Sequence, residues 1–223
     1  MQKTLSILIM NLENKNKSIF IHICKCGGTS INKLLGPHIW SRDFANNGFA
    51  WEKEYKALKA GKGHFTIEAI RKGIDRHIFE KTFKFTVVRN PWSRLVSAYH
   101  YGKASGRTLT NAKSFDQFVK DIDEYVWCEQ FKKNLKSVHA LNCVDWISDS
   151  DGNVLVDFVA KLENQQKDFN TICDKIGIPK QELPHYNKTE HKHYTEYYDD
   201  GTRELVAEKY AKDIEYFGYE FGD

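Results

Sequence analysis

The sequence lacks the features that define several large classes of protein. Its five cysteines are odd in number and scattered, with no C-x-x-C pair, so we expect reduced thiols in a cytoplasmic protein. No internal repeat, low-complexity tract or long Gly/Ser/Pro linker divides the 223 residues. We therefore expect a polar N-terminal arm over residues 1–17 and a single domain over residues 18–223.

Neither an excess of one charge nor a long hydrophobic run is present. The 33 basic residues nearly balance the 30 acidic ones, which argues against a nucleic-acid partner and implies that positive charge acts locally. The apolar run over residues 5–10 is too short to cross a bilayer, and no signal-peptide cleavage region follows it. With 14 Phe, 11 Tyr and 5 Trp, the chain has the composition of a folded globule with no membrane segment.

Apolar runs and helical spacings alternate along the chain. They predict strands over residues 18–24, 83–89 and 153–162, and helices over 29–35, 66–72, 91–99, 115–122, 169–176 and 206–217. This alternation is typical of an α/β fold with a central, mainly parallel sheet flanked by helices. In such folds ligands bind beyond the carboxyl ends of the strands, where two polar motifs lie here.

The first motif is Cys24-Lys-Cys-Gly-Gly-Thr-Ser, between a predicted strand and a predicted helix. Gly27 and Gly28 allow a tight turn that approaches an oxyanion closely, and Thr29 and Ser30 offer hydroxyl and backbone N–H donors. Lys25 supplies a mobile ammonium group, which suits negative charge that grows during group transfer. The motif has the composition of a small anion cradle, although a turn with a solvated lysine has the same composition.

Spacing distinguishes this motif from other loops of similar composition. A Walker A loop places its lysine after the glycines, whereas Lys25 precedes them. A cysteine phosphatase loop requires an arginine six residues after its cysteine, and positions 30 and 32 are Ser and Asn. Cys24 and Cys26 have no second matching pair with which to bind a metal, so we expect no metal.

The second motif runs from Arg89 to Ser97 and also follows a predicted strand. Asn90 and Pro91 are typical of a helix start, and Ser97 lies almost two helical turns beyond Asn90. Arg89 and Ser97 can therefore converge on one phosphate, while Arg94 either joins them or pairs with an acidic group at the surface. The alternative is a capped helix with ordinary surface arginines. Together the two motifs suggest a ligand with two separated anionic groups, and hence a nucleotide-dependent transferase.

In this order, the two motifs resemble those of sulfotransferases that use 3′-phosphoadenosine 5′-phosphosulfate (PAPS). The resemblance is to the family-2, carbohydrate-type branch, with its Pro-Lys-Thr-Gly-Gly-Thr-Ser loop and Arg-Asn-Pro-x-x-Arg-x-x-Ser-x-Tyr segment. The second pattern is matched fully over residues 89–99, whereas Cys24 and Cys26 replace Pro and Thr in the first. Supporting matches extend the resemblance over roughly residues 18–221, which implies a P-loop-like sulfotransferase fold.

The resemblance also implies roles for individual residues. Lys25 would stabilise the leaving group, and the 5′-phosphate would bind at residues 26–30, which are Cys26, Gly27, Gly28, Thr29 and Ser30. Arg89 and Ser97 would hold the 3′-phosphate. His64 would be the catalytic base, because it occupies that position in related carbohydrate sulfotransferases, and Glu68 and Glu163 are weaker candidates. PAPS would be the donor, and no metal is required.

Two other functions remain open at this stage. A nucleotide-dependent kinase with an atypical phosphate loop would require Mg²⁺ and ATP, and a non-catalytic nucleotide- or glycan-binding module would bind ligand without transfer. For a sulfotransferase, the acceptor would be a hydroxyl or amine of a carbohydrate or small molecule. Aromatic residues between positions 40 and 55 are candidates for stacking on a sugar or for forming a hydrophobic lid.

Overall fold

A parallel sheet of three strands lies at the centre of the described part of the chain, which comprises residues 17–39, 64–104, 112–122, 141–184 and 192–223 of a computed structural model. The strands are β1 (Ser18–Ile21), β2 (Phe83–Val88) and β3 (Phe158–Lys161), in the order β1-β2-β3. Ser18 pairs with Phe83 and Phe85 with Phe158, so β2 is the central strand. The expected α/β fold with a parallel sheet is confirmed.

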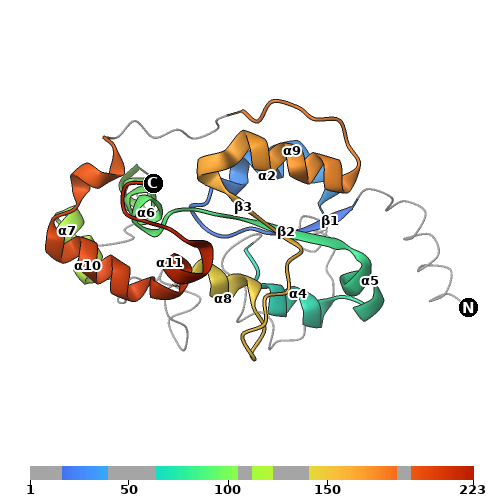
Figure 1. Ribbon diagram of the computed structural model, residues 1–223, viewed down its shortest axis with the longest axis horizontal. Coiled ribbons are helices and arrows are strands. Elements are labelled where there is room, and N and C mark those ends of the chain that lie inside the picture. The colour runs from blue at the N-terminus through green and yellow to red at the C-terminus, as the bar shows by residue number, and fades with distance from the viewer. Residues whose placement is uncertain (1–16, 40–63, 105–111, 123–140, 185–191) are drawn as a thin grey trace, which may run out of the picture.

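Helices cover both faces of this sheet (Figure 1). One face packs against α2 (Gly28–Leu35) and α9 (Gln165–Ile176), and the other against α4 (Ile67–Gly73), α5 (Arg76–Lys81) and α8 (Cys143–Ile147). Alternate residues of β1 therefore enter different cores: Ile19 and Ile21 pack with Ile70, and Phe20 packs with Phe169. Burial on both faces explains why apolar residues predominate in all three strands.

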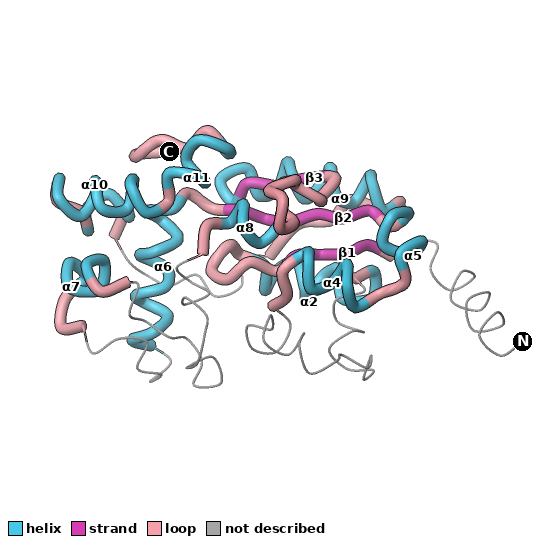
Figure 2. Tube along the Cα trace, turned by 90° about the horizontal axis from the view of Figure 1, so that it is seen from below, coloured by secondary structure: helices cyan, strands magenta, loops and turns pink. Residues whose placement is uncertain are grey.

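A group of helices lies beyond the carboxyl ends of the strands (Figures 1 and 2). It contains α6 (Pro91–Ala104), α7 (Phe115–Lys120) and α10 (Asp200–Lys209), while α11 (Ala211–Phe217) packs against α8. Short 3₁₀ turns span Gly36–His38, Leu162–Asn164 and Tyr194–Tyr197. The predicted apolar face of α6, including Trp92, Leu95 and Val96, is buried in this group.

Three predicted elements differ from the observed ones. The strand over residues 153–162 is shorter, Phe158–Lys161, because Val154 pairs in an antiparallel bridge with Ser148, across the turn that Asp149 holds, and not with β2. The helix over residues 206–217 is interrupted at Tyr210, whose backbone (φ −106°, ψ 25°) leaves the helical region between α10 and α11. The first strand ends at Ile21, so His22 lies beyond it, contrary to the sequence prediction. Among the described residues, no helix has the length and apolar character needed to span a membrane.

A substitution at Phe85 tests whether β2 is the buried central strand of the sheet. Its side chain is fully buried and stacks on Phe20 with 5.0 Å between ring centroids. We expect Phe85→Ala to lower the free energy of unfolding by about 3–5 kcal/mol, because it removes a large core side chain and leaves a cavity. Chemical denaturation measures this loss. The control Tyr216→Ala removes an exposed ring and should change the free energy of unfolding by less than about 0.5 kcal/mol. Equal losses in the two variants would contradict the placement of Phe85 in the core.

Candidate active site

The two sequence motifs lie side by side because β1 and β2 are parallel neighbours. Thr86 of β2 donates its hydroxyl to the carbonyl of Ile21 at 2.8 Å, which fixes the end of β1 against β2. Beyond these strand ends, Nη1 of Arg89 donates to the carbonyl of Lys25 at 3.4 Å. The structure therefore brings together two cationic residues that are 64 positions apart in the sequence.

The turn between β1 and α2 has an unusual backbone. Lys25 has φ 66° and Gly27 has φ 76°, so both residues are in the left-handed region that L side chains rarely adopt. The sequence analysis assigned the glycines to close approach of an oxyanion. In the structure, a Cβ on Gly27 would lie 2.6 Å from Cδ1 of Leu162, and a Cβ on Gly28 would overlap the His22 ring. The glycines are thus required by side chains of the protein itself.

The ammonium of Lys25 lies 3.7 Å from the centroid of the Tyr101 ring, an arrangement typical of a cation–π contact. Burial, together with the nearby positive charge of Arg89, lowers the pKa of Lys25 to about 8. Both effects disfavour the charged form, and an anion bound at this site would oppose them. Lys25 is therefore held where negative charge would be stabilised.

Arg89 is held at the start of α6. Its Nε donates to the hydroxyl of Ser93 at 2.9 Å, and burial lowers the pKa of its guanidinium without removing the charge. Ser97 is half-buried and lies one helical turn beyond Ser93. It is therefore on the same side of α6 as Ser93, the residue that Arg89 contacts. The sequence analysis missed Ser93, although its spacing of four residues from Arg89 was a signal for this contact.

Asn90 begins α6 as predicted. Its side-chain oxygen accepts the N–H groups of Trp92 at 3.1 Å and Ser93 at 3.3 Å, which is an N-terminal cap.

Asn90 also ties α6 to two distant segments. Its backbone N–H donates to Oε1 of Glu163 at 2.8 Å, and its amide nitrogen donates to the carbonyl of Glu220. Because Glu163 also accepts the hydroxyl of Tyr219 at 3.2 Å, its carboxylate is occupied by structural contacts.

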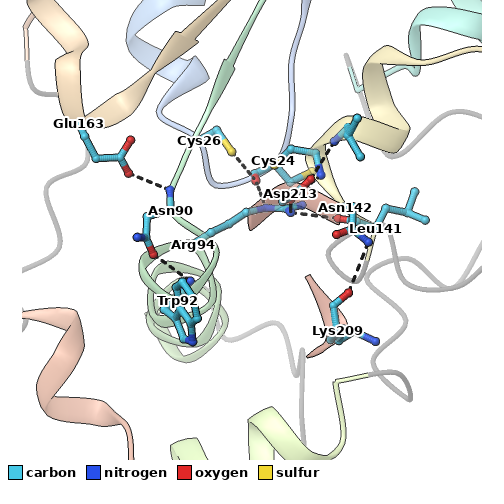
Figure 3. A network of polar contacts seen from close by, with 12 residues as sticks. Cys24, Cys26, Asn90, Trp92, Arg94, Leu141, Asn142, Glu163, Lys209 and Asp213 are labelled. Carbon is cyan, nitrogen blue, oxygen red and sulfur yellow. Dashed lines mark hydrogen bonds and ion pairs between the residues drawn. The ribbon is translucent and has the colours of Figure 1, made fainter. Parts of the chain in front are cut away.

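Arg94 has neither of the two positions that the sequence analysis considered. Its side chain is only 2% exposed, so it does not pair with a surface acid. Instead of reaching toward Ser97, its guanidinium donates to the carbonyl of Cys24 and to that of Leu141 (Figure 3). The sequence could not predict these contacts, because the acceptors are backbone carbonyls of distant segments.

His64 is presented to the turn with one ring nitrogen already occupied. Its Nδ1 lies 2.7 Å from the carbonyl of His22, which can only accept, so Nδ1 carries the proton and Nε2 the lone pair. Burial lowers the pKa of His64, which is therefore neutral at pH 7. Its ring lies 4.2 Å from that of His22, whose Nδ1 accepts from the Asn32 amide. A neutral His64 with a lone pair on Nε2 is in the protonation state that a general base requires.

The other residues of the first motif have mixed accessibility. Thr29 is exposed, Ser30 is buried, and the Ser30 N–H already donates to the Gly27 carbonyl at 3.2 Å. Burial raises the pKa of Cys24 to about 12, so it is a neutral thiol at pH 7, and Cys26 Sγ lies 3.6 Å from the Cys24 carbonyl. Within the described ranges, no group of three or more His, Cys, Asp or Glu could hold a metal ion.

Some predicted features lie outside the described residues. They are the N-terminal arm, apart from residue 17, and the aromatic positions between 40 and 55 that were candidates for stacking on an acceptor. The candidate site is therefore confined to described residues. It consists of a glycine turn with Lys25, the start of α6 with Arg89, and His64 beside the turn.

The parallel α/β fold thus places two turns, one with Lys25 and one with Arg89, at neighbouring strand ends. The chain matches the sulfotransferase family over residues 10–220 and belongs to that family. It is 28% identical over 114 residues to an uncharacterized protein of Archaeoglobus fulgidus, covering 50% of this chain and 82% of that protein. It also resembles the crystal structure of a sulfotransferase from Alicyclobacillus acidocaldarius, with TM-score 0.49 and 16% identity, covering 89% and 93% of the two chains.

The contact between Gly28 and His22 yields a test of the turn. Gly28→Ala places a methyl group on the His22 ring, and we expect the free energy of unfolding to fall by about 1–3 kcal/mol through overpacking. Chemical denaturation measures the change. The matched control is Gly201→Ala in α10, where the nearest atom to the new Cβ would be 3.7 Å away. This control should leave stability unchanged or raise it by up to about 1 kcal/mol, and a loss equal to that of Gly28→Ala would contradict the assignment.

Proposed function

We propose that the protein is a PAPS-dependent sulfotransferase that transfers a sulfuryl group to a hydroxyl or amine of a carbohydrate or small-molecule acceptor. The observation that carries the proposal is the contact between Arg89 Nη1 and the carbonyl of Lys25. It supports two adjacent anion sites, which suit a nucleotide with a phosphosulfate at one end and a phosphate on its ribose. We also propose a cytoplasmic location, since the described cysteines are free thiols.

The 5′ side of the nucleotide would bind at the turn before α2. The first N–H groups of a helix have no acceptor within the helix, so they can donate to a phosphate. Gly27 and Gly28 fit this role because a Cβ at either position would meet Leu162 or His22, so the turn has room for glycine only. Lys25 adds a positive charge beside the same phosphate. PAPS, when bound, supplies the activated sulfuryl group.

The 3′-phosphate would bind at Arg89 and Ser97. The guanidinium supplies a charged fork of donors and Ser97 a hydroxyl, and both belong to the first part of the segment after β2. A nucleotide without a 3′-phosphate would leave the partly buried Arg89 without its anion. This difference would favour PAPS over ATP.

His64 and Lys25 would serve the transfer itself. Nε2 of His64 would take the proton of the acceptor as the acceptor oxygen or nitrogen forms its bond to sulfur. The bond from sulfur to the bridging oxygen breaks, and the Lys25 ammonium would stabilise the negative charge on the departing phosphate. The protein therefore contributes positioning and charge stabilisation, as in phosphoryl transfer.

These roles predict the pH dependence of kcat/KM, which reports the ionisation of the free enzyme. His64 must be neutral, so activity is lost as the pH falls through its pKa, which burial places below 6.5. Lys25 must be charged, so activity is lost as the pH rises through about 8. We expect a bell-shaped profile, measured with labelled PAPS and a panel of acceptors. Lys25→Arg should remove the alkaline limb, and persistence of that limb in this variant would contradict the role of Lys25.

The 3′-phosphate assignment predicts selective binding. We expect 3′-phosphoadenosine 5′-phosphate to raise the melting temperature clearly more than AMP or ADP does, and to bind at least 10-fold more tightly than AMP, about 1.4 kcal/mol. Arg89→Ala should remove most of this preference. The control Arg76→Ala alters an exposed arginine of α5 and should retain it. If Arg89→Ala weakened AMP binding equally, the 3′-phosphate would not be the group that Arg89 holds.

The same measurements separate the two alternative functions. A kinase with an atypical loop would be stabilised most by ATP with Mg²⁺. A binding module would be stabilised by 3′-phosphoadenosine 5′-phosphate but would transfer no sulfate to any acceptor in the panel. The neutral His64 beside the turn favours the enzyme, because a binding module has no need for a proton acceptor there.

A further inference from the structure

Arg94 is a buried arginine with a specific target. It lies in α6, and its Nε donates to the carbonyl of Cys24 at 3.2 Å while its Nη1 donates to the carbonyl of Leu141 at 3.0 Å (Figure 3). The first carbonyl belongs to the peptide that immediately precedes Lys25. The second belongs to the segment that leads into α8. One guanidinium therefore ties the turn of the first motif to a distant part of the chain.

Asp213 of α11 anchors the other side of this guanidinium. It is 1% exposed, and its Oδ2 lies 3.9 Å from Nη1 of Arg94. The same carboxylate accepts the N–H of Cys143 at 2.7 Å and that of Val144 at 2.9 Å, at the beginning of α8. These contacts fix the carboxylate of Asp213. The guanidinium of Arg94 therefore lies between this fixed carboxylate and the carbonyl of Cys24.

The energetics of this arrangement do not favour stability as its main purpose. A fully buried charge pair offsets much of its attraction by the loss of hydration, and apolar replacements of such pairs are often as stable. Nη2 of Arg94 is also buried and has no hydrogen-bond partner among the described residues. An apolar side chain could make none of the contacts of Arg94 with the Cys24 carbonyl, the Leu141 carbonyl and Asp213. Of these three contacts, the hydrogen bond to Cys24 is the one that reaches the turn.

The hydrogen bond from Arg94 to the Cys24 carbonyl acts on the backbone next to Lys25. Lys25 has a left-handed backbone conformation that is unfavourable for its side chain. Arg94 holds the carbonyl before Lys25, and Arg89 holds the carbonyl of Lys25 itself. Both peptide groups that flank the Lys25 α-carbon are therefore fixed by arginines of the second motif, and they set the direction in which the Lys25 side chain leaves the backbone.

We propose that Arg94, supported by Asp213, is a positioning residue that fixes the peptide between Cys24 and Lys25 and thereby aims the Lys25 ammonium. Its importance for catalysis rests on the function proposed above. Its effect on Lys25 itself does not, because the contacts exist in the protein alone. The two statements can therefore be tested separately.

The test is Arg94→Lys, which retains the positive charge but replaces the two nitrogens that donate to the two carbonyls, Nε and Nη1, with a single ammonium nitrogen. Lys25 is titrated by brief labelling with acetic anhydride across a pH series, with acetylation of Lys25 quantified by mass spectrometry. In the wild-type protein the amine should titrate near pH 8. In the variant the released turn admits water, so the pKa should rise toward 10.5, the ordinary value. Turnover of PAPS should fall roughly 10- to 100-fold, with a smaller change in KM.

Two further variants separate a change at Lys25 from a general loss of stability. Ile176→Ala removes a core side chain at the far end of α9, so it lowers stability without touching the turn, and the Lys25 titration should not change. Asp213→Asn keeps Arg94 but removes the carboxylate that faces it, so the Lys25 pKa should rise, by less than in Arg94→Lys. This variant decides the question if Arg94→Lys does not fold.

The outcomes are distinct. A lower melting temperature with an unchanged Lys25 titration in Arg94→Lys or Asp213→Asn would make Arg94 a purely structural residue and overturn the inference. A shifted titration in these variants, absent in Ile176→Ala, would support it. If the titration shifts but the wild-type protein neither binds 3′-phosphoadenosine 5′-phosphate nor transfers sulfate, the proposed function fails while the positioning of Lys25 stands.

Discussion

Two consecutive backbone carbonyls, those of Cys24 and Lys25, are the points on which the candidate site depends. Each accepts a hydrogen bond from an arginine of the segment after β2: Arg94 binds the first and Arg89 the second. Parallel pairing of β1 with β2 places the two strand ends together, and these bonds then fix the turn against α6. The second motif therefore shapes the first as well as carrying the proposed 3′-phosphate site.

The same arrangement concentrates positive charge in a partly buried place. Burial lowers the pKa of Lys25, and the charge of Arg89 lowers it further, so the unliganded site is electrostatically unfavourable. The Tyr101 ring offsets part of this cost through its contact with the Lys25 ammonium. An anionic ligand would relieve the repulsion between the two cations. Both cations are in place before any ligand binds, which supports the proposed electrostatic stabilisation of a transfer reaction.

The fold and the positions of the motifs were predictable because both depend on local patterns. Apolar runs marked β1 and β2, and the Asn90-Pro91 pair marked the start of α6, whose cap is confirmed. Contacts between distant segments were not predictable. The direction of Arg94 depends on backbone carbonyls and on Asp213, none of which leaves a pattern in the sequence.

The glycines of the turn show a second limit of sequence reasoning. Their spacing indicated an anion loop, but their immediate physical reason is contact with Leu162 and His22, which only the fold brings near. The role of His64 came from family resemblance, whereas Ser97 was inferred as a phosphate ligand from its helical spacing, and the resemblance added that the phosphate is the 3′ one. The structure adds a neutral His64 with a free Nε2, while Ser97 as a phosphate ligand stays a prediction.

The most direct measurement is a crystal structure of the protein with 3′-phosphoadenosine 5′-phosphate. The account predicts the 3′-phosphate within hydrogen-bonding distance of the Arg89 guanidinium and the Ser97 hydroxyl. It places the 5′-phosphate at the N-terminus of α2, with the Lys25 ammonium turned from Tyr101 toward it. A nucleotide bound in the reverse orientation, or away from the turn between β1 and α2, would contradict it.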